Sequence, residues 1–344
     1  MSAPALRTAA GLWCRDVISC TWATLAEHVA RAGRDPLHVL GLHWEFRFRP
    51  GDVRSEEFYF AGAWPEDLAR SLAPESGIGS RWHRADDDED PLAELAAHTD
   101  AGRPVIAAVD NYHLPFRPAY HDVHAAHLVV VHAVDRAAGT VTVSDAMPPA
   151  FAGAITAKDF RNSWESVNPS DEQDAFFSDS RIDRRYLTVT VPAELPALDP
   201  PGLRRALDGN VRGFTGAAAH GPEGDWTGLA GLTRFLADLR ERTAAGDGGA
   251  LRDAYPFGWG MQAQAGLHGE LLRRFGAEHD VPALREAGRR VEAVAHAWTG
   301  VRLCAAHGHP DPLAALPELD AHATRLDEAY RHAVAAVHEA WRAL

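Results

Sequence analysis

Runs of apolar and β-branched residues in the first half of the chain predict strands. These runs are rich in valine, isoleucine and threonine and end at turn residues, which is typical of strands. Residues 135–139 supply a turn of about five residues between two of the runs, so we expect a hairpin within an antiparallel sheet. The predicted strands are residues 104–109, 128–134, 140–144 and 186–191.

A short amphipathic helix is predicted ahead of these strands. Trp22, Leu25 and Val29 recur at positions i, i+3 and i+7, the spacing of one helix face. Ser19 occupies the position of an N-cap, and Gly33 ends the segment. Cys20 therefore falls in the first turn of the helix.

The second half of the chain carries alanine, leucine, arginine and glutamate at helical spacing. Between the halves, residues 191–201 contain four prolines, which neither continue a helix nor donate to a sheet. We expect an α+β protein with a catalytic domain over residues 1–195 and an all-helical domain over residues 196–344. The predicted helices are residues 203–216, 226–243, 251–276, 282–306 and 313–343.

Composition excludes several classes of protein. The chain has 344 residues and a formal charge of −14, which disfavours nucleic acids and anionic lipids as partners. No long apolar run is present, and the first fourteen residues lack the apolar core of a secretory signal. Three cysteines fit reduced thiols better than a disulfide framework. We therefore expect a cytoplasmic protein without a membrane segment.

Cys20, His127 and Asp145 are the candidate catalytic residues. A thiol in the first turn of a helix is favoured as thiolate by the helix dipole and by unpaired amide hydrogens. A hairpin centred on residue 136 or 137 places Asp145 opposite His127 or Val129, so either register puts the histidine and the aspartate on one face. The alternative is that Cys20 is inert packing and the His–Asp proximity is coincidental.

Several motifs in the same region resemble the butirosin biosynthesis protein H family. They are Cys20-Thr-Trp-Ala-Thr-Leu25, Gly41-Leu-His-Trp44-Glu-Phe46, Val109-Asp-Asn-Tyr-His-Leu-Pro-Phe116, His124-Ala-Ala-His127 and Val141-Thr-Val-Ser-Asp145. The resemblance implies a papain-like fold and a cysteine acyltransferase of secondary metabolism. It implies that Cys20 takes an acyl group from the phosphopantetheine thioester of an acyl or peptidyl carrier protein, that His127 relays the proton, and that Asp145 orients the histidine.

One position departs from papain-like enzymes. They often carry a glutamine about six residues before the cysteine to complete the oxyanion hole, and here Cys14 stands there. Asp16, Ser19 or the backbone amide of Cys20 are the substitutes. We expect no bound cofactor, and we expect no metal at His121, His124 and His127, because a loop entering a strand does not guarantee a metal geometry.

Five further residues are predicted to bind the substrates. One of the substrates is expected to be a small-molecule amine, the acceptor of the acyl group. For Asp110 and Tyr112 the alternative is turn stabilisation, and for Trp44 it is packing. Two rival functions remain: a papain-like peptidase, amidase or thioesterase, and a non-catalytic binding protein. Attack by a group within the acyl chain would give a cyclised product. The predicted substrate-binding residues are Asp110, Tyr112, His113, His124 and Trp44.

Overall fold

The N-terminal half of the protein is built on a six-stranded antiparallel sheet. The computed structural model describes residues 8–51, 62–86, 89–195, 198–216 and 224–344. The strand order is β2-β7-β3-β4-β5-β6. The strands are β2 (Gly79–Arg84), β3 (Val105–Asp110), β4 (Ala126–Asp135), β5 (Thr140–Asp145), β6 (Phe151–Thr156) and β7 (Arg185–Thr190). The predicted α+β class and antiparallel sheet are confirmed.

The predicted hairpin is formed by β4 and β5. Val130 lies opposite Ser144 and Val131 opposite Val143, and a bulge follows at Val131. Since opposed residues in this stretch sum to 274, Asp145 stands beside Val129 and diagonal to His127. This is the second of the two predicted registers, and it keeps His127 and Asp145 on one face.

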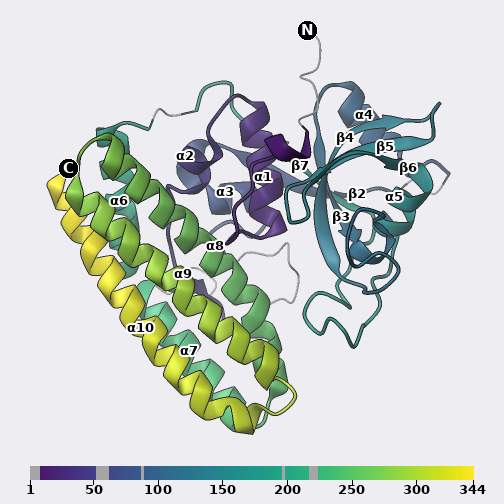
Figure 1. Cartoon of the computed structure of the whole chain (residues 1–344). Coiled ribbons are helices and arrows are strands. Elements are labelled where there is room, and N and C mark those ends of the chain that lie inside the picture. Colours follow the sequence, from purple (N-terminus) through teal and green to yellow (C-terminus); the bar gives the residue numbers. More distant parts are fainter. Residues whose placement is uncertain (1–7, 52–61, 87–88, 196–197, 217–223) are drawn as a thin grey trace.

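Helices cover both faces of the sheet (Figure 1). The helix α1 (Cys20–Arg31) packs on β4 and β5, whereas α4 (Ala93–Asp100) and α5 (Ala157–Trp164) pack against β3, β4, β5 and β6. Alternate residues of β4 divide between two apolar clusters, with Ala126 and Leu128 in the cluster of α1 and Val129 and Val131 in the other. Both sides of the strand are therefore buried, which explains its continuous apolar run.

Ser19 takes the N-cap position of α1, but its side chain makes no capping hydrogen bond. This corrects the expected role of the hydroxyl. The sequence pattern did not predict β2, β6, α4 or α5, nor two shorter helices of the first half, α2 (Pro36–Leu40) and α3 (Leu68–Leu72). Each is five residues long, too short to show a helical period, and Asp35 and Asp67 cap them.

The second half is a bundle of long helices, as predicted. Figure 1 shows these helices lying side by side at one side of the molecule, with α1 between them and the sheet. A two-stranded pair, Arg47–Phe48 (β1) with Trp226–Thr227 (β8), ties the halves together. The helices are α6 (Pro200–Thr215), α7 (Gly228–Ala244), α8 (Gly248–Glu278), α9 (Pro282–Gly308) and α10 (Pro312–Ala343).

One apolar core crosses the predicted boundary at residue 195. It contains Cys20 and Leu25 from α1, Phe46 and Phe48 from the following segment, and Trp298 from α9. Secondary structure changes at the proline-rich segment, but the buried side chains on its two sides pack together. Within the described residues, none of the helices combines the length and the apolar character that crossing a lipid bilayer would require.

Close packing of α8 on α9 gives a stability prediction. A Cβ on Gly288 would lie 2.6 Å from the Gly269 carbonyl oxygen and 2.8 Å from the Arg273 backbone nitrogen. Gly288→Ala is therefore expected to lower the free energy of unfolding by about 1–3 kcal/mol, despite the higher helix propensity of alanine. Urea unfolding followed by circular dichroism measures the change.

Gly209 in α6 is the matched control, because a Cβ there would meet no atom within 4 Å. Gly209→Ala is expected to raise the free energy of unfolding by about 1 kcal/mol. Equal effects of the two substitutions would contradict the close-approach argument.

Candidate active site

Cys20 is the first residue of α1 and is fully buried. The first amide hydrogens of a helix have no partner within the helix, and the dipole is positive there. Both effects favour a thiolate and provide donors for a nearby oxyanion. The position is therefore chemically suited to a nucleophile.

His127 and Asp145 form a buried hydrogen-bonded pair. His127 Nε2 lies 2.8 Å from Asp145 Oδ2, and the side chains are 2% and 1% exposed. The carboxylate also accepts a hydrogen bond from the Arg117 guanidinium at 3.1 Å and one from the Met147 amide at 2.8 Å. Since a carboxylate only accepts, Nε2 of His127 carries the hydrogen, and Nδ1 is the nitrogen that can take a proton.

The packing of α1 brings Cys20 to the level of His127. Near the other end of the helix, His28 Nε2 meets the Pro104 carbonyl oxygen at 3.2 Å, just before β3 begins. Eight residues of helix span about 12 Å, the length of about four strand residues. Cys20 therefore lies level with the opposed pair Ala108 and Leu128, one residue from His127.

An electrostatic effect agrees with this placement. The charge of the Asp145 carboxylate contributes to the raised pKa of the Cys14 thiol, after burial and Asp16, so Cys14 lies within range of that charge. Ala146, which follows Asp145, belongs to the same apolar cluster as Cys20. These observations agree with a Cys20 that lies toward the end of the sheet where the His127–Asp145 pair stands.

The other two thiols lie in different surroundings. Burial, with a smaller contribution from Asp16, raises the pKa of Cys14. Burial and Glu318 raise the pKa of Cys304 to about 11. Both groups are therefore protonated at neutral pH and are poor nucleophiles. All three cysteines are unbridged.

Among the three predicted substitutes for the missing glutamine, the Ser19 hydroxyl is the one that is buried without a hydrogen-bond partner in the described residues. Its Oγ is buried and has no hydrogen-bond partner among the described residues. A buried hydroxyl without a partner costs free energy, and this one stands directly before Cys20. The Ser19 carbonyl oxygen accepts from the Ala23 amide at 3.0 Å, but the side chain makes no capping hydrogen bond.

Four of the predicted substrate-binding residues form one cluster at the end of β3. The Asp110 carboxylate is fully buried and accepts hydrogen bonds from His124 Nδ1 at 2.7 Å and from Ser166 Oγ at 2.6 Å. The Tyr112 ring stacks on His124 with centroids 4.1 Å apart and meets His113 edge-on at 5.0 Å. These side chains surround the beginning of β4, the strand that carries His127.

Trp44 does not join this cluster. It is 1% exposed and contacts Phe214, His268 and Tyr330 from the helical half. These contacts agree with the alternative that Trp44 is a packing residue of the core. Its backbone amide is held by Asn210 of α6 at 3.3 Å, so this residue fixes the first half of the chain to the bundle.

The helical half reaches the catalytic end of the sheet through α8. Trp259 Nε1 donates to the Ile18 carbonyl oxygen at 3.4 Å, two residues before Cys20. The Phe177 carbonyl oxygen accepts from the Ala126 amide, and the Phe177 ring packs on Trp259 at 5.6 Å. Trp259 of α8 therefore contacts the segment before Cys20 and the Phe177 loop, which is bonded to the residue before His127.

Two contacts of the candidate site had no signal in the sequence. Arg117 holds Asp145, and Ser166 holds Asp110. Neither belongs to a periodic pattern, and both lie in loops whose paths only the fold decides. Within the described residues, no group of three or more histidine, cysteine, aspartate and glutamate side chains is arranged to hold a metal.

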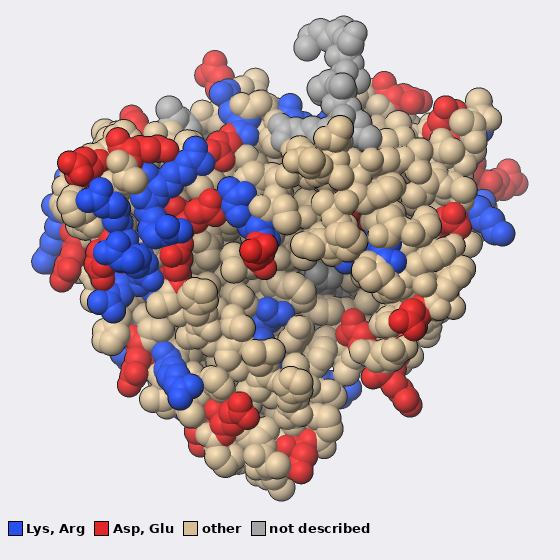
Figure 2. Space-filling model, viewed as in Figure 1, with Lys and Arg blue, Asp and Glu red and all other residues tan. Residues whose placement is uncertain are grey.

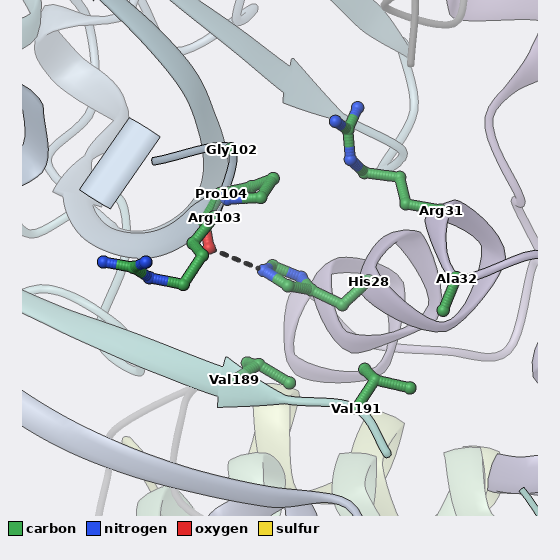
Figure 3. Close-up of a pocket in the computed structure, with 8 residues that line it drawn as sticks. All are labelled: His28, Arg31, Ala32, Gly102, Arg103, Pro104, Val189 and Val191. Carbon is green, nitrogen blue, oxygen red and sulfur yellow. Dashed lines mark hydrogen bonds between the residues drawn. The ribbon is translucent and has the colours of Figure 1, made fainter. Parts of the chain in front are cut away.

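A separate cavity of about 230 Å³ lies at the C-terminal end of α1. Figure 3 shows the His28 ring directed at the Pro104 carbonyl, with the Arg31 and Arg103 guanidinium groups apart from one another. Burial lowers the pKa of His28. Since Cys20 begins the same helix, the cavity and the thiol lie at opposite ends of it.

Part of the chain matches a known protein family. Residues 19–146 match the family described as Butirosin biosynthesis protein H, N-terminal. This match contains Cys20, His127 and Asp145, and it confirms the resemblance drawn from the sequence motifs. A search of curated proteins finds no match to the chain.

Proposed function

Because residues 19–146 match the butirosin biosynthesis protein H N-terminal family, we propose that this protein is a biosynthetic enzyme that transfers acyl groups. The name of the family describes a protein of antibiotic biosynthesis. The reaction that we propose moves an acyl or aminoacyl group from a carrier-protein thioester to an amine. Cys20 is the nucleophile, His127 the base and acid, and Asp145 the residue that orients His127.

In the first half-reaction the Cys20 thiol loses its proton to His127 Nδ1 and attacks the thioester carbonyl. The bond between that carbon and the pantetheine sulfur breaks, and the departing thiolate takes the proton back from His127. One thioester replaces another, so the step changes the free energy little. The product is an acyl-enzyme on Cys20 and a free pantetheine thiol.

In the second half-reaction an uncharged amine attacks the acyl-enzyme. The new C–N bond forms, the C–S bond to Cys20 breaks, and one proton passes from nitrogen to sulfur through His127. Amide formation outcompetes hydrolysis only where water is excluded. The aromatic side chains of α8 over the Cys20 loop, with Trp259 bonded to Ile18, support such exclusion.

The observation that carries the proposal is the buried His127–Asp145 pair at the end of the sheet where a helix begins with a buried cysteine. The test is intact mass spectrometry after exposure to a panel of acyl-pantetheine thioesters. We expect an adduct of the mass of the acyl group. A protein that acquires no acyl group from any member of the panel would contradict the proposal.

Related measurements distinguish acyl transfer from two other functions. A papain-like hydrolase would release the free acid from the thioester and form no amide when an amine is added. A non-catalytic binding protein would have a Cys20 that reacts with iodoacetamide no faster than an ordinary thiol at neutral pH. An internal nucleophile in the acyl chain would yield a cyclised product, whose mass is that of the free acid less one water.

The unpartnered Ser19 hydroxyl leads to a prediction about the oxyanion hole. Ser19→Ala is expected to lower kcat of acyl transfer about 10²-fold, because one donor to the tetrahedral oxyanion is lost. The free energy of unfolding should stay the same or rise, since a buried hydroxyl without a partner is removed. An unchanged kcat would remove Ser19 from the mechanism.

The proposed protein partner is an acyl or peptidyl carrier protein, with a small amine as acceptor. Carrier proteins are usually acidic, and Figure 2 shows that basic side chains gather over the end of the bundle where α8 ends and α9 begins. Five arginines of α8 and α9 at this end are paired with acidic residues in the described part of the chain. The pairs are Arg273–Glu292, Arg274–Asp35, Arg285–Asp280, Arg289–Glu286 and Arg290–Glu286.

A carrier that docks on this surface must exchange these ion pairs. Arg47 and Arg49, another basic pair, are both bound to the buried Asp225. Docking by charge would be salt-dependent, so the KM for a carrier-bound substrate should rise with ionic strength while the KM for free acyl-pantetheine stays constant.

A further inference from the structure

The amine acceptor poses a proton problem that His127 alone does not solve. A primary amine is an ammonium at neutral pH and carries three N–H bonds, whereas the amide product carries one. One of the two lost protons passes through His127 to the Cys20 sulfur. The other must leave before attack, because an ammonium has no lone pair. Water needs no such step, since it is uncharged.

A second histidine–aspartate pair stands beside the first. His124 and His127 are three residues apart in the chain, so their Cα atoms are at most about 11 Å from one another. In the register of β3 and β4, Asp110 lies opposite Ala126 and Val109 lies opposite His127. Both pairs therefore occupy the same corner of the sheet.

The chemistry of the second pair is that of a base. The Asp110 carboxylate is fully buried and takes four donors: His124 Nδ1, Ser166 Oγ and the amides of Tyr112 and Ala125. Because the carboxylate accepts the hydrogen bond from His124, it fixes the hydrogen of this ring on Nδ1. The lone pair of the neutral imidazole is then on Nε2.

The His124 ring is positioned to meet a ligand. The side chain is 22% exposed, in contrast to the buried His127, and Tyr112 stacks on it at 4.1 Å with an interplanar angle of 9°. The Tyr112 ring contacts one face of the imidazole and Asp110 bonds its Nδ1, so the two contacts together fix the orientation of the His124 ring. The titratable groups around it within the described residues are Asp110, Tyr112, His113, His121 and Asp171.

We propose that His124, held by Asp110, is a second general base that deprotonates the incoming ammonium before it attacks the acyl-enzyme. This inference rests on the proposed acyl transfer. The ammonium N–H bond breaks, its electron pair remains on nitrogen, and the proton moves to Nε2 of His124. The protonated imidazole is stabilised by the Asp110 carboxylate and returns its proton to solvent.

The test compares His124→Asn with the wild type, using two acceptors at pH 7. The asparagine amide can still donate to Asp110 from the place of Nδ1. One acceptor is n-butylamine, which is protonated at this pH, and the other is hydroxylamine, which is uncharged. The thioester is the acyl-pantetheine that labels Cys20 most completely, and the products are quantified by mass spectrometry.

We expect the variant to form the Cys20 adduct at the wild-type rate. Amide formation with n-butylamine should fall about 10²–10⁴-fold, hydroxamate formation should stay within about threefold, and the butylamine defect should shrink as pH rises. His121→Asn is the matched control: it removes a neighbouring exposed ring, whose centroid lies 5.4 Å from that of Tyr112, and should affect both acceptors little.

The possible failures are distinguishable. If the wild type forms no Cys20 adduct, or forms no amide with either acceptor, the proposed function itself fails and this inference with it. If the wild type transfers normally and His124→Asn slows both acceptors equally, or slows neither, acyl transfer stands and the second base is refuted.

Discussion

Replacement of Cys20 by alanine is expected to abolish acylation of the protein and to lower acyl transfer by at least about 10⁴-fold. In the proposed mechanism the covalent intermediate forms on this sulfur, which belongs to the first residue of α1. The substitution deletes one buried atom, so we expect a loss of only about 1 kcal/mol in the free energy of unfolding. Intact mass and thermal unfolding measure the two effects separately.

Cys14→Ala is the control for this experiment. Cys14 is the nearest thiol along the chain, and burial and Asp16 raise its pKa, so the variant should acylate as the wild type does. Peptide mapping after brief treatment with iodoacetamide should place the label on Cys20 before Cys14 and Cys304. Acylation that survives in Cys20→Ala and disappears in Cys14→Ala would show that Cys14, and not Cys20, is the nucleophile.

Asp145→Asn should produce the second largest loss, a fall in kcat of about 10⁴-fold. The amide can present its NH₂ group to His127 and reverse the hydrogen bond that now keeps the hydrogen on Nε2. His127 Nδ1 would then carry the hydrogen and could no longer accept one from Cys20. The rate of Cys20 acylation, followed by stopped-flow release of pantetheine thiol, measures this loss.

The substitution also affects stability, because Asp145 is the carboxylate partner of Arg117, whose side chain is 13% exposed. We expect a loss of about 3–5 kcal/mol in the free energy of unfolding when that largely buried guanidinium loses its partner. Arg117→Gln separates the two effects. It removes the same ion pair and keeps the His127–Asp145 bond, so its kcat should remain within about tenfold of the wild type. A loss of 10⁴-fold in Arg117→Gln would contradict this separation, because the His127–Asp145 bond alone would then not sustain activity.

Periodic patterns were sufficient to predict the main elements. The β-branched runs predicted four strands of the sheet, and the turn at residues 135–139 predicted the β4–β5 hairpin and therefore the shared face of His127 and Asp145. These predictions hold because strand pairing across a short turn is local, and local geometry follows from residue type. Short elements such as α2 have no room for a period and could not be found in this way.

The cluster at Asp110 was only partly predictable. Motif resemblance singled out Asp110, Tyr112, His113 and His124, but not that they contact one another or that Ser166 completes the ring of donors. Trp44 belonged to the same set and lies among the bundle helices instead. An aromatic residue in a motif is compatible with a binding surface or with a core, and burial decides between them.

By itself, the sequence determined four of the six strands of the sheet, α1 and the five helices of the bundle, the class of fold, the hairpin register to one of two choices, and the residues suited to nucleophile, base and orienting group. Only the tertiary structure decided which elements meet: that α1 lies along β4, that Arg117 and Ser166 reach the two aspartates, and that α8 covers the cysteine loop. The physical reason is range. Backbone propensity and period act over a few residues, whereas these contacts join segments tens to hundreds of residues apart and depend on how all the apolar faces are buried together.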